Sequence, residues 1–334
     1  MIRRNRLLST VTVAFTAALV VTACGGRQQP SAGPEATDAS SCQASSGQIT
    51  IATGNSTGVY YALGGGLASL ISGNTPLKAT AAETGASVQN IEQLVAGEYN
   101  IAFSLADTAA DAVRGQGGFT GPQQVQALAR IYSNYTHVIV QRSSGIKTMA
   151  DFRGKRISTG SPKSGTEVIA NRLLQAAGLN PETDVSPQRL ELGKTVDAMK
   201  DGSIDGFVWS GGLPTGGVTD LFTSAGDRVE FIDITDLLPK MKEINPVYDE
   251  GTVPGSAYGT PDVKTIVVPN LLLVRNDFPA NDACAITKLM FDKKADLEKV
   301  HPAAKELDPT LAADTAPVQL APGSRTALEQ LNAS

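Results

Sequence analysis

The chain is poor in the residues that enzymes and metal sites most often use. Its 334 residues include two histidines, three cysteines and one tryptophan. A zinc site would need carboxylates to complete its three or four ligands, and a Ser-His-Asp triad has only His137 and His301 to draw on. We therefore expect both histidines to be structural, and we expect no metal, no cofactor and no catalytic residue.

Positive charge is scarce as well. The chain has 28 lysines and arginines against 33 acidic residues, which gives a formal net charge of −5. A nucleic-acid partner would require a basic surface for its phosphates, so this class of partner is excluded. Hydrophobic residues make up 41%, enough to build a core, and the length fits about two domains at roughly 100–200 residues each.

The N-terminal residues have the pattern of a targeting segment. Three arginines within the first six residues precede an uncharged, mostly apolar run, 7–21. This run is shorter than the roughly 20 residues of a membrane span and typical of a signal peptide. It ends in VTACG, which looks like a bacterial lipobox. We predict a signal peptide over 1–23 and a lipid on Cys24, which would anchor the protein at the extracytoplasmic face of the cell membrane; the alternative is an ordinary signal peptide cleaved after Ala23.

The next segment is predicted to be a flexible tether over 24–47. Residues 25–47 contain no large apolar side chain, so they cannot bury enough surface to offset the entropy of ordering them. With Cys24 acylated, Cys42 and Cys284 form an even pair in an oxidising compartment, and we predict a disulfide between them. The alternative is two independent thiols.

From residue 48 onward, strand patterns alternate with helix patterns, which indicates βα units. A strand over 49–52 leads through the loop 53–58 into a helix over 59–71, and a strand over 156–158 leads through the loop 159–165 into a helix over 166–177. Two further segments, about 105 residues apart, also correspond. The spacing of Ile91, Leu94, Gly97 and Asn100 is the same as that of Val196, Met199, Gly202 and Asp205.

These repeated units predict two similar α/β lobes. Extended runs at 125–131 and 136–141 can carry the chain from one lobe to the other, and a further run at 265–274 can carry it back. We assign 48–136 plus 275–334 to lobe I and 137–274 to lobe II. The predicted fold is an α/β clamshell with a cleft between the lobes.

Small polar residues collect where the predicted strands end. The loops 53–58, 83–87 and 159–165 are rich in such residues, and loops at the carboxyl ends of parallel strands are where α/β sheets bind ligands. Free amide groups at the following helix starts favour an anion. Ser164 begins an S-x-x-E pattern, so it either caps its helix, holds a ligand, or does both. Trp209 either faces the cleft or packs in the core.

Several segments resemble the TAXI family of solute receptors for TRAP (tripartite ATP-independent periplasmic) transporters. The resemblance runs from Ile49 to about Leu328. Its motifs are 51–54 with 57–61 (IATG, TGVYY), 83–91 (ETGASVQNI), 144–148 with 151–156 (SGIKT, DFRGKR), 205–209 with 212–216 (DGFVW, GLPTG) and 301–303 with 321–324 (HPA, APGS). The sequence departs from the family pattern at Lys163, where a small residue is expected, and at Trp209, where tyrosine is common.

The resemblance implies a type II periplasmic-binding-protein-like receptor, not an enzyme. It would act as a monomer that closes on a small organic anion, such as glutamate or 2-oxoglutarate, and delivers it to TRAP permease subunits. The alternatives are a receptor for an ABC permease and an enzyme on the scaffold of thiamine-pyrimidine synthases. Glu83 is expected either to pair a ligand ammonium or to cap a helix. The ligand contacts that the resemblance implies are Thr57, Tyr60, Glu83, Ser87, Ser104, Asp107, Ser161, Ser164, Thr166 and Trp209.

Overall fold

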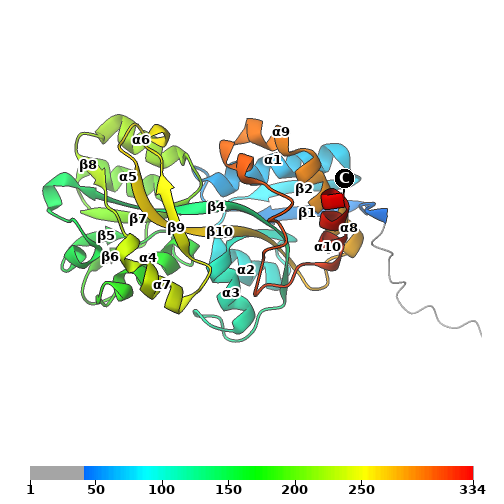
Figure 1. The fold of residues 1–334 in the computed structure, drawn as a ribbon, viewed down its shortest axis with the longest axis horizontal. Coiled ribbons are helices and arrows are strands. Elements are labelled where there is room, and N and C mark those ends of the chain that lie inside the picture. Colours follow the sequence, from blue (N-terminus) through cyan, green and yellow to red (C-terminus); the bar gives the residue numbers. More distant parts are fainter. Residues whose placement is uncertain (1–40, 334) are drawn as a thin grey trace, which may run out of the picture. The chain divides into compact units, whose positions relative to one another are not determined.

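A computed structural model describes residues 41–333 of the chain. The predicted signal peptide 1–23, Cys24 and the predicted tether as far as residue 40 lie outside the described residues. The first lobe contains three parallel strands that alternate with helices (Figure 1). Its elements are β1 (Gly47–Ala52), α1 (Val59–Asn74), β2 (Leu77–Ala82), α2 (Ser87–Val95), β3 (Ile101–Leu105) and α3 (Ala106–Arg114).

The second lobe repeats this arrangement and adds two strands and one more helix. Three helices near the C-terminus, α8 (Ala280–Asp292), α9 (Lys294–Val300) and α10 (Pro322–Ala333), return to the first lobe, where α1 contacts both α8 and α9. The elements of the second lobe are β5 (Arg156–Ser158), α4 (Gly165–Ala176), β6 (Ser186–Gln188), α5 (Leu192–Asp201), β7 (Gly206–Gly211), α6 (Gly216–Ala225), β8 (Val229–Phe231), α7 (Leu238–Ile244) and β9 (Asp249–Val253).

Two long antiparallel strands, β4 (Val125–Gln141) and β10 (Val263–Arg275), join the lobes. The strand order is β2-β1-β3-β10-β4-β7-β5-β6, with β8 beside β4 and β9 beside β10. β1, β2 and β3 are parallel to one another, as are β5, β6 and β7, whereas β10 is antiparallel to β3 and to β9, and β4 is antiparallel to β7 and to β8. The predicted α/β two-lobe fold is confirmed. The predicted lobe boundaries after residues 136 and 274 fall inside β4 and β10.

The core has one shared part and two separate parts. On one face of the sheet, residues from α2, α3, α4 and α7 belong to a single apolar cluster that runs through both lobes. On the other face, α1 and α8–α10 enclose one cluster in the first lobe, and α5 and α6 enclose another in the second (Figure 1). The lobes therefore share packing on one side of the connecting strands and are packed separately on the other.

The predicted internal repeat is confirmed at the level of individual hydrogen bonds. Asn100 accepts a bond from the amide of Thr50 through its side chain and donates its own amide to the Thr50 carbonyl, at 2.9 and 3.0 Å. Asp205 makes the same two bonds with Arg156, both at 2.8 Å. The residue after each pair begins the parallel pairing of β1 with β3 and of β5 with β7. Equivalent side chains thus set the strand register in both lobes.

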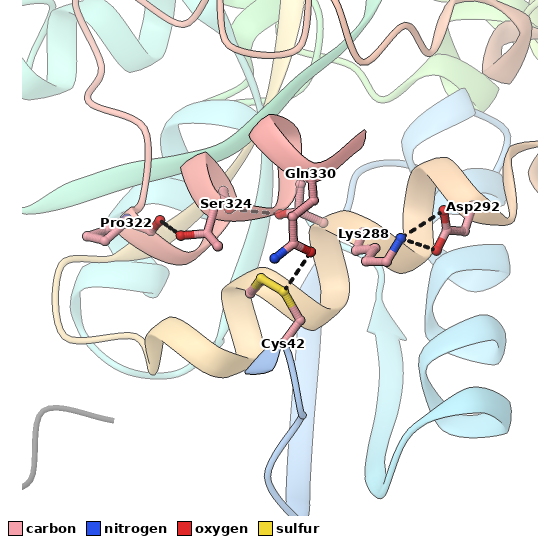
Figure 2. The surroundings of a disulfide bond; sticks show 9 residues. Cys42, Lys288, Asp292, Pro322, Ser324 and Gln330 are labelled. Atoms are coloured by element: carbon pink, nitrogen blue, oxygen red, sulfur yellow. Dashed lines mark hydrogen bonds and ion pairs between the residues drawn. A yellow bond between two sulfur atoms is a disulfide. The ribbon is translucent and has the colours of Figure 1, made fainter. Parts of the chain in front are cut away.

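Residues 42–45, at the end of the predicted tether, are held against the first lobe. Cys42 and Cys284 of α8 form a disulfide with their Cα atoms 4.9 Å apart, and Sγ of Cys42 lies 3.7 Å from Oε1 of Gln330 on α10 (Figure 2). Ser45 donates to the carboxylate of Asp282 through its amide and its hydroxyl, at 2.6 and 2.9 Å. Composition suggests flexibility here, but these cross-links to distant residues fix the segment.

Candidate functional site

Three loops and one strand end meet in a cavity between the lobes. The loops lead into α1, α2 and α4, and the strand end belongs to β7. The cavity is small, with about 30 Å³ of room for the centres of water-sized groups. It is lined by Gly54, Asn55, Gly58, Val59, Tyr60, Gly85, Ala86, Ser87, Leu105, Tyr132, Asn134, Ser164, Gly165, Thr166, Trp209, Ser210, Gly211 and Gly212.

Five of the ten sequence-predicted contacts line this cavity: Tyr60, Ser87, Ser164, Thr166 and Trp209. Each already has a partner in the protein. Ser87 Oγ accepts from the amide of Leu105 at 3.1 Å, and Thr166 Oγ1 accepts from the amide of Ser210 at 3.3 Å. The Tyr60 hydroxyl donates to Asn270 Oδ1, and burial raises the pKa of Tyr60 far above its usual value. Tyr60 is therefore a neutral hydrogen-bonding group.

The other five predicted contacts lie outside the cavity lining. Thr57 and Glu83 are exposed, and Glu83 accepts from the amide of Ser56 at 2.8 Å. Ser104 is fully buried and donates to the carbonyl of Leu105 at 3.0 Å. Ser161 is buried with its Oγ 3.3 Å from the amide group of Asn55, and Asp107 lies in the separate ionic cluster described below.

The structure also brings in lining residues that sequence reasoning did not select as contacts. Asn55 approaches the second lobe, where its Oδ1 accepts from the amide of Leu192 at 3.3 Å. Asn134 donates to the carbonyl of Ser210 at 3.1 Å. The hydroxyls of Tyr132 and Ser210 are buried and have no hydrogen-bond partner within residues 41–333. Such unpaired groups are uncommon in protein interiors, so these two hydroxyls hold hydrogen-bonding capacity that the described residues do not use.

Ser164 shows how the sequence folds this part of the site. Its Oγ accepts from the amide of Glu167 at 3.0 Å, so the predicted N-cap is confirmed. The reciprocal half of the capping box is different, because the Glu167 carboxylate accepts from the amide of Lys163 at 2.8 Å rather than from that of Ser164. Gly178 has φ +80° just after the helix, as expected for its C′ position.

Trp209 extends from β7 to the loop of the first lobe. A Cβ atom placed on Gly58 would lie 3.5 Å from Cζ2 of the indole, so the ring contacts the start of α1. Its Nε1 donates to Thr215 Oγ1 at 3.2 Å, and that hydroxyl donates to the carbonyl of Gly212 at 2.7 Å. The Thr215 amide donates to the hydroxyl of Tyr258 at 2.8 Å. The sole tryptophan is therefore held in the cavity wall by a hydrogen-bonded chain.

His137 completes this chain behind the indole. Its Nδ1 lies 2.8 Å from the carbonyl of Tyr135, which can only accept, so Nδ1 carries the proton and Nε2 accepts from the Tyr258 hydroxyl at 2.9 Å. Burial lowers the pKa of His137 to about 4, although the carbonyls of Tyr135 and Trp209 act in the opposite direction. His137 is therefore neutral near pH 7, in keeping with a structural role.

This pKa predicts a pH-dependent loss of stability. The His137 pKa is about 4 in the folded state and about 6.5 in the unfolded state, so the unfolded state binds more protons between these values. The free energy of unfolding should fall by about 1 kcal/mol from pH 7 to 5.5 through this group. Urea titrations at both pH values should show a smaller fall for His137→Asn than for the parent. An equal fall in the two proteins would contradict the assignment.

A buried ionic cluster joins the lobes next to the site. Arg172 of α4 pairs with Asp107 of α3 at 2.9 Å and with Asp111, one turn further along α3. The Tyr248 hydroxyl donates to Asp107 and accepts from Arg172 at 2.9 Å. Burial and the charge of Asp107 raise the pKa of Asp111, and Arg172 opposes this rise. The Asp107 carboxylate is thus occupied by groups of the protein itself.

The electrostatics of the cavity come from the backbone. No lining residue carries a formal charge near neutral pH, and the starts of α1, α2 and α4 all contribute lining residues. The amide groups in the first turn of a helix carry partial positive charge and attract anions. The arrangement can therefore bind a small anion through amides and hydroxyls.

Within residues 41–333, no group of three or more His, Cys, Asp or Glu side chains could hold a metal ion. Over the same range, no helix has both the length and the apolar character that a membrane span requires.

Comparison with known proteins places the chain in a family. Among solved structures, the binding protein component of an ABC phosphonate transporter from Pseudomonas aeruginosa is 13% identical, with a TM-score of 0.55 over 79% of this chain and 80% of that one. A protein of Bordetella bronchiseptica RB50 is 20% identical, with a TM-score of 0.52 over 86% and 89%. These likenesses concern the fold alone. A model of the NMT1-like family matches residues 51–329, and the chain therefore belongs to the NMT1-like family.

Proposed function

We propose that this protein is an extracytoplasmic solute receptor that binds a small organic anion between its lobes and delivers it to a membrane permease. One observation carries the proposal: the starts of three helices, two from the first lobe and one from the second, converge on a cavity with uncharged lining. The backbone amides at these starts would bind the anion, as helix N-termini do elsewhere. Membership of the NMT1-like family and the two-lobe fold are consistent with this role.

Contacts between the lobes support a mechanism of opening and closing. The amide of Gln89 in the first lobe donates to the carbonyl of Lys163 in the second at 3.0 Å, and Lys163 pairs with Glu92 at 2.8 Å. The space open to the centres of water-sized groups is about 30 Å³, room for roughly two of them at about 10–15 Å³ each. A dicarboxylate has more heavy atoms than that, so the lobes would have to part to admit it. Binding would then be coupled to closure, as in other hinged receptors.

The finer assignments follow the TAXI resemblance. We propose a TRAP-type permease as the partner, an acidic amino acid or dicarboxylate as the ligand, and a monomeric receptor with a lipid on Cys24. The second candidate is a receptor for an ABC permease, because one protein of similar fold is the binding component of an ABC phosphonate transporter. That likeness concerns the fold and does not distinguish the two permease classes. A neighbouring gene for a large fused permease would favour TRAP, and a neighbouring ATPase gene would favour ABC.

An enzymatic function is less well supported by the cavity. Chemistry of the thiamine-pyrimidine type would need a reactive histidine or lysine at the cleft. Within the described residues neither histidine lines the cavity, since His137 lies behind Trp209 and His301 Nε2 bonds to the carbonyl of Pro214 at 3.0 Å. Lys163 also lies outside the lining and pairs with Glu92. We therefore propose binding without a chemical step.

A thermal-shift panel tests the proposal. The purified protein is mixed with 2-oxoglutarate, succinate, malate, glutamate, alkylsulfonates and alkylphosphonates, with neutral amino acids as controls. A ligand at 100 times its Kd should stabilise the folded protein by about 2.7 kcal/mol, a clear rise in Tm. In Ser164→Ala and Trp209→Ala, the ligand-induced shift should shrink. Both variants should also start from a lower Tm, because one loses the N-cap of α4 and the other the packing of the indole, so each shift is measured from the variant's own ligand-free Tm. A panel in which no anion raises the Tm would count against the proposed receptor function.

A further inference from the structure

The polar groups around the cavity limit which chemical groups the bound anion can carry. Amino acids and their keto or unsubstituted counterparts share their acidic groups and differ in one ammonium. An ammonium withdrawn from water needs a carboxylate or several free acceptors beside it, because burying an unpaired charge is costly. Whether the cleft offers such a group therefore decides between these ligand classes.

The polar groups of the cavity suit an anion. The first turns of α1 and α2 contain no acidic residue, and the Glu83 carboxylate accepts from the amide of Ser56, which precedes α1. The amides of the first turns themselves therefore keep their partial positive charge. The one acidic side chain in the first turn of α4, Glu167, accepts from the Lys163 amide and pairs with Arg189 at 2.6 Å. The same surroundings that favour an anion would repel an ammonium.

Two hydroxyls add a second, independent indication. Ser210 and Tyr132 line the cavity, are only 5% and 1% exposed, and have no hydrogen-bond partner for their hydroxyls within residues 41–333. A hydroxyl can donate to an anion as well as accept. Burial, followed by the effect of the Tyr60 hydroxyl, raises the pKa of Tyr132 well above its usual value, so this group keeps its proton. Both hydroxyls can therefore donate to an acidic ligand oxygen.

Asp107 and Glu83, the two carboxylates among the contacts that the resemblance implies, are both poorly suited to pair a ligand ammonium. Asp107 has no exposed surface and is engaged by Arg172, Tyr248 and the amide of Thr108, which donates to it at 2.7 Å. Turning Asp107 toward a ligand would leave Arg172 with one carboxylate fewer. Glu83 is exposed, lies outside the lining and accepts from the Ser56 amide.

We propose that the ligand is an organic anion that bears no ammonium group. The inference rests on the proposed receptor function and narrows its substrate class from acidic amino acids and dicarboxylates to acids without an amino group. The neutral donors of the cavity can bind the acidic groups of both kinds of ligand. They provide no counter-charge for the ammonium, which only the amino acids carry.

Matched pairs of probes test this inference by calorimetric titration of the purified protein. Each pair differs chiefly by the ammonium: 2-oxoglutarate with L-glutamate, succinate with L-aspartate, ethanesulfonate with taurine, and ethylphosphonate with 2-aminoethylphosphonate. In the pair that binds, we expect the anion without an ammonium to bind at least tenfold more tightly. Equal or tighter binding of the amino compound would overturn the inference and leave the receptor function standing. Failure of every anion in every pair would instead reject the receptor function, and with it the inference.

Two variants separate the possible outcomes. Glu83→Gln should leave the ratio of affinities within each pair unchanged. A loss of amino-acid binding in this variant would show that Glu83 binds an ammonium and would overturn the inference. Ser210→Ala removes a hydroxyl that is free in the structure, so it should weaken binding of the anion about five- to tenfold without lowering the Tm of the free protein. Unchanged anion binding in Ser210→Ala would contradict the role given to this hydroxyl.

Discussion

Gly165→Ala is expected to abolish most of the ligand affinity while leaving the protein folded. Gly165 begins α4 and faces the first lobe across the cavity. A Cβ atom at this position would lie 2.5 Å from Cδ1 of Leu105 and 2.7 Å from Oγ of Ser87, closer than such atoms approach one another. The added methyl group is therefore accommodated only if the lobes stay apart.

The added methyl group raises the free energy of the closed form. Overpacking a close contact costs about 1–3 kcal/mol, and each 1.4 kcal/mol changes Kd about tenfold. We expect Gly165→Ala to raise the Kd for the tightest anion of the panel about ten- to a hundredfold. The φ of Gly165 would not itself oppose alanine. Because Leu105 belongs to the apolar cluster shared by both lobes, urea unfolding without ligand should also show a loss of stability of up to about 1–3 kcal/mol, and affinity is therefore measured well below the unfolding transition.

Gly65 offers a matched control. It lies within α1, and a Cβ atom placed there has no neighbour within 4 Å. Gly65→Ala should therefore bind ligand like the parent and gain about 0.5–1 kcal/mol of stability from the better helix propensity of alanine. Intrinsic fluorescence of the sole tryptophan gives a second measurement, because Trp209 touches Gly58 across the cleft. Binding by Gly165→Ala within twofold of the parent would contradict this account of closure.

Local features of the fold could be predicted from the sequence because they depend on neighbouring residues. The cap at Ser164, the helix end at Gly178 and the small polar loops after β1 and β2 are each encoded within a few positions. The repeated Asn100 and Asp205 could also be found, because spacing within each lobe is regular. The loops and helix starts expected from the sequence therefore indicate where the cavity lies, but they identify only some of the side chains that line it.

Side-chain directions could not be predicted where the strands are buried on both faces. All five residues of β3 are buried, so a period of two does not distinguish the sides of the strand. Nothing in the local sequence shows that Ser104, a contact that the family resemblance implies, lies outside the cavity lining. Tyr132 and Asn134 belong to β4, whose pairing with β10 shifts register near Pro269. Such an irregularity breaks the alternation on which orientation arguments depend.

Asp107 illustrates a different limit. It lies in the first turn of α3, directly after β3, the position of many ligand-binding residues. Its partner Arg172 is 65 residues further along the chain and in the other lobe. Pairing across such a distance leaves no local signal. The same cluster supplies the second large effect that we expect.

Arg172→Met should destabilise the protein by about 3–5 kcal/mol, the usual cost of breaking a buried ion pair. The side chain of Arg172 is 11% exposed, and those of Asp107 and Asp111 are 0% and 6% exposed. Removing the guanidinium leaves two buried carboxylates beside each other. Asp107 keeps the Tyr248 hydroxyl and the Thr108 amide as donors, whereas Asp111 loses its Arg172 partner.

The pH dependence distinguishes this mechanism from a simple loss of packing. Burial already raises the pKa of Asp111, and loss of Arg172 should raise it further. With a folded pKa above the unfolded one, the folded state binds more protons between the two values, so the stability lost at pH 7 should be partly regained at pH 5. Urea unfolding of the parent and of Arg172→Met at both pH values measures this recovery. Asp111→Asn in the same chain should recover stability at pH 7 in the same way.

The control is an arginine of the same kind at the surface. Arg142 pairs with Glu230 at 2.7 Å, but its side chain is 53% exposed, and such pairs contribute about 0–1 kcal/mol. Arg142→Met should therefore cost little at either pH. If Arg172→Met cost no more than Arg142→Met, the buried cluster would not be what fixes α3 of the first lobe against α4 of the second. If instead the loss were large but independent of pH, packing of the Arg172 side chain rather than its charge would carry the effect.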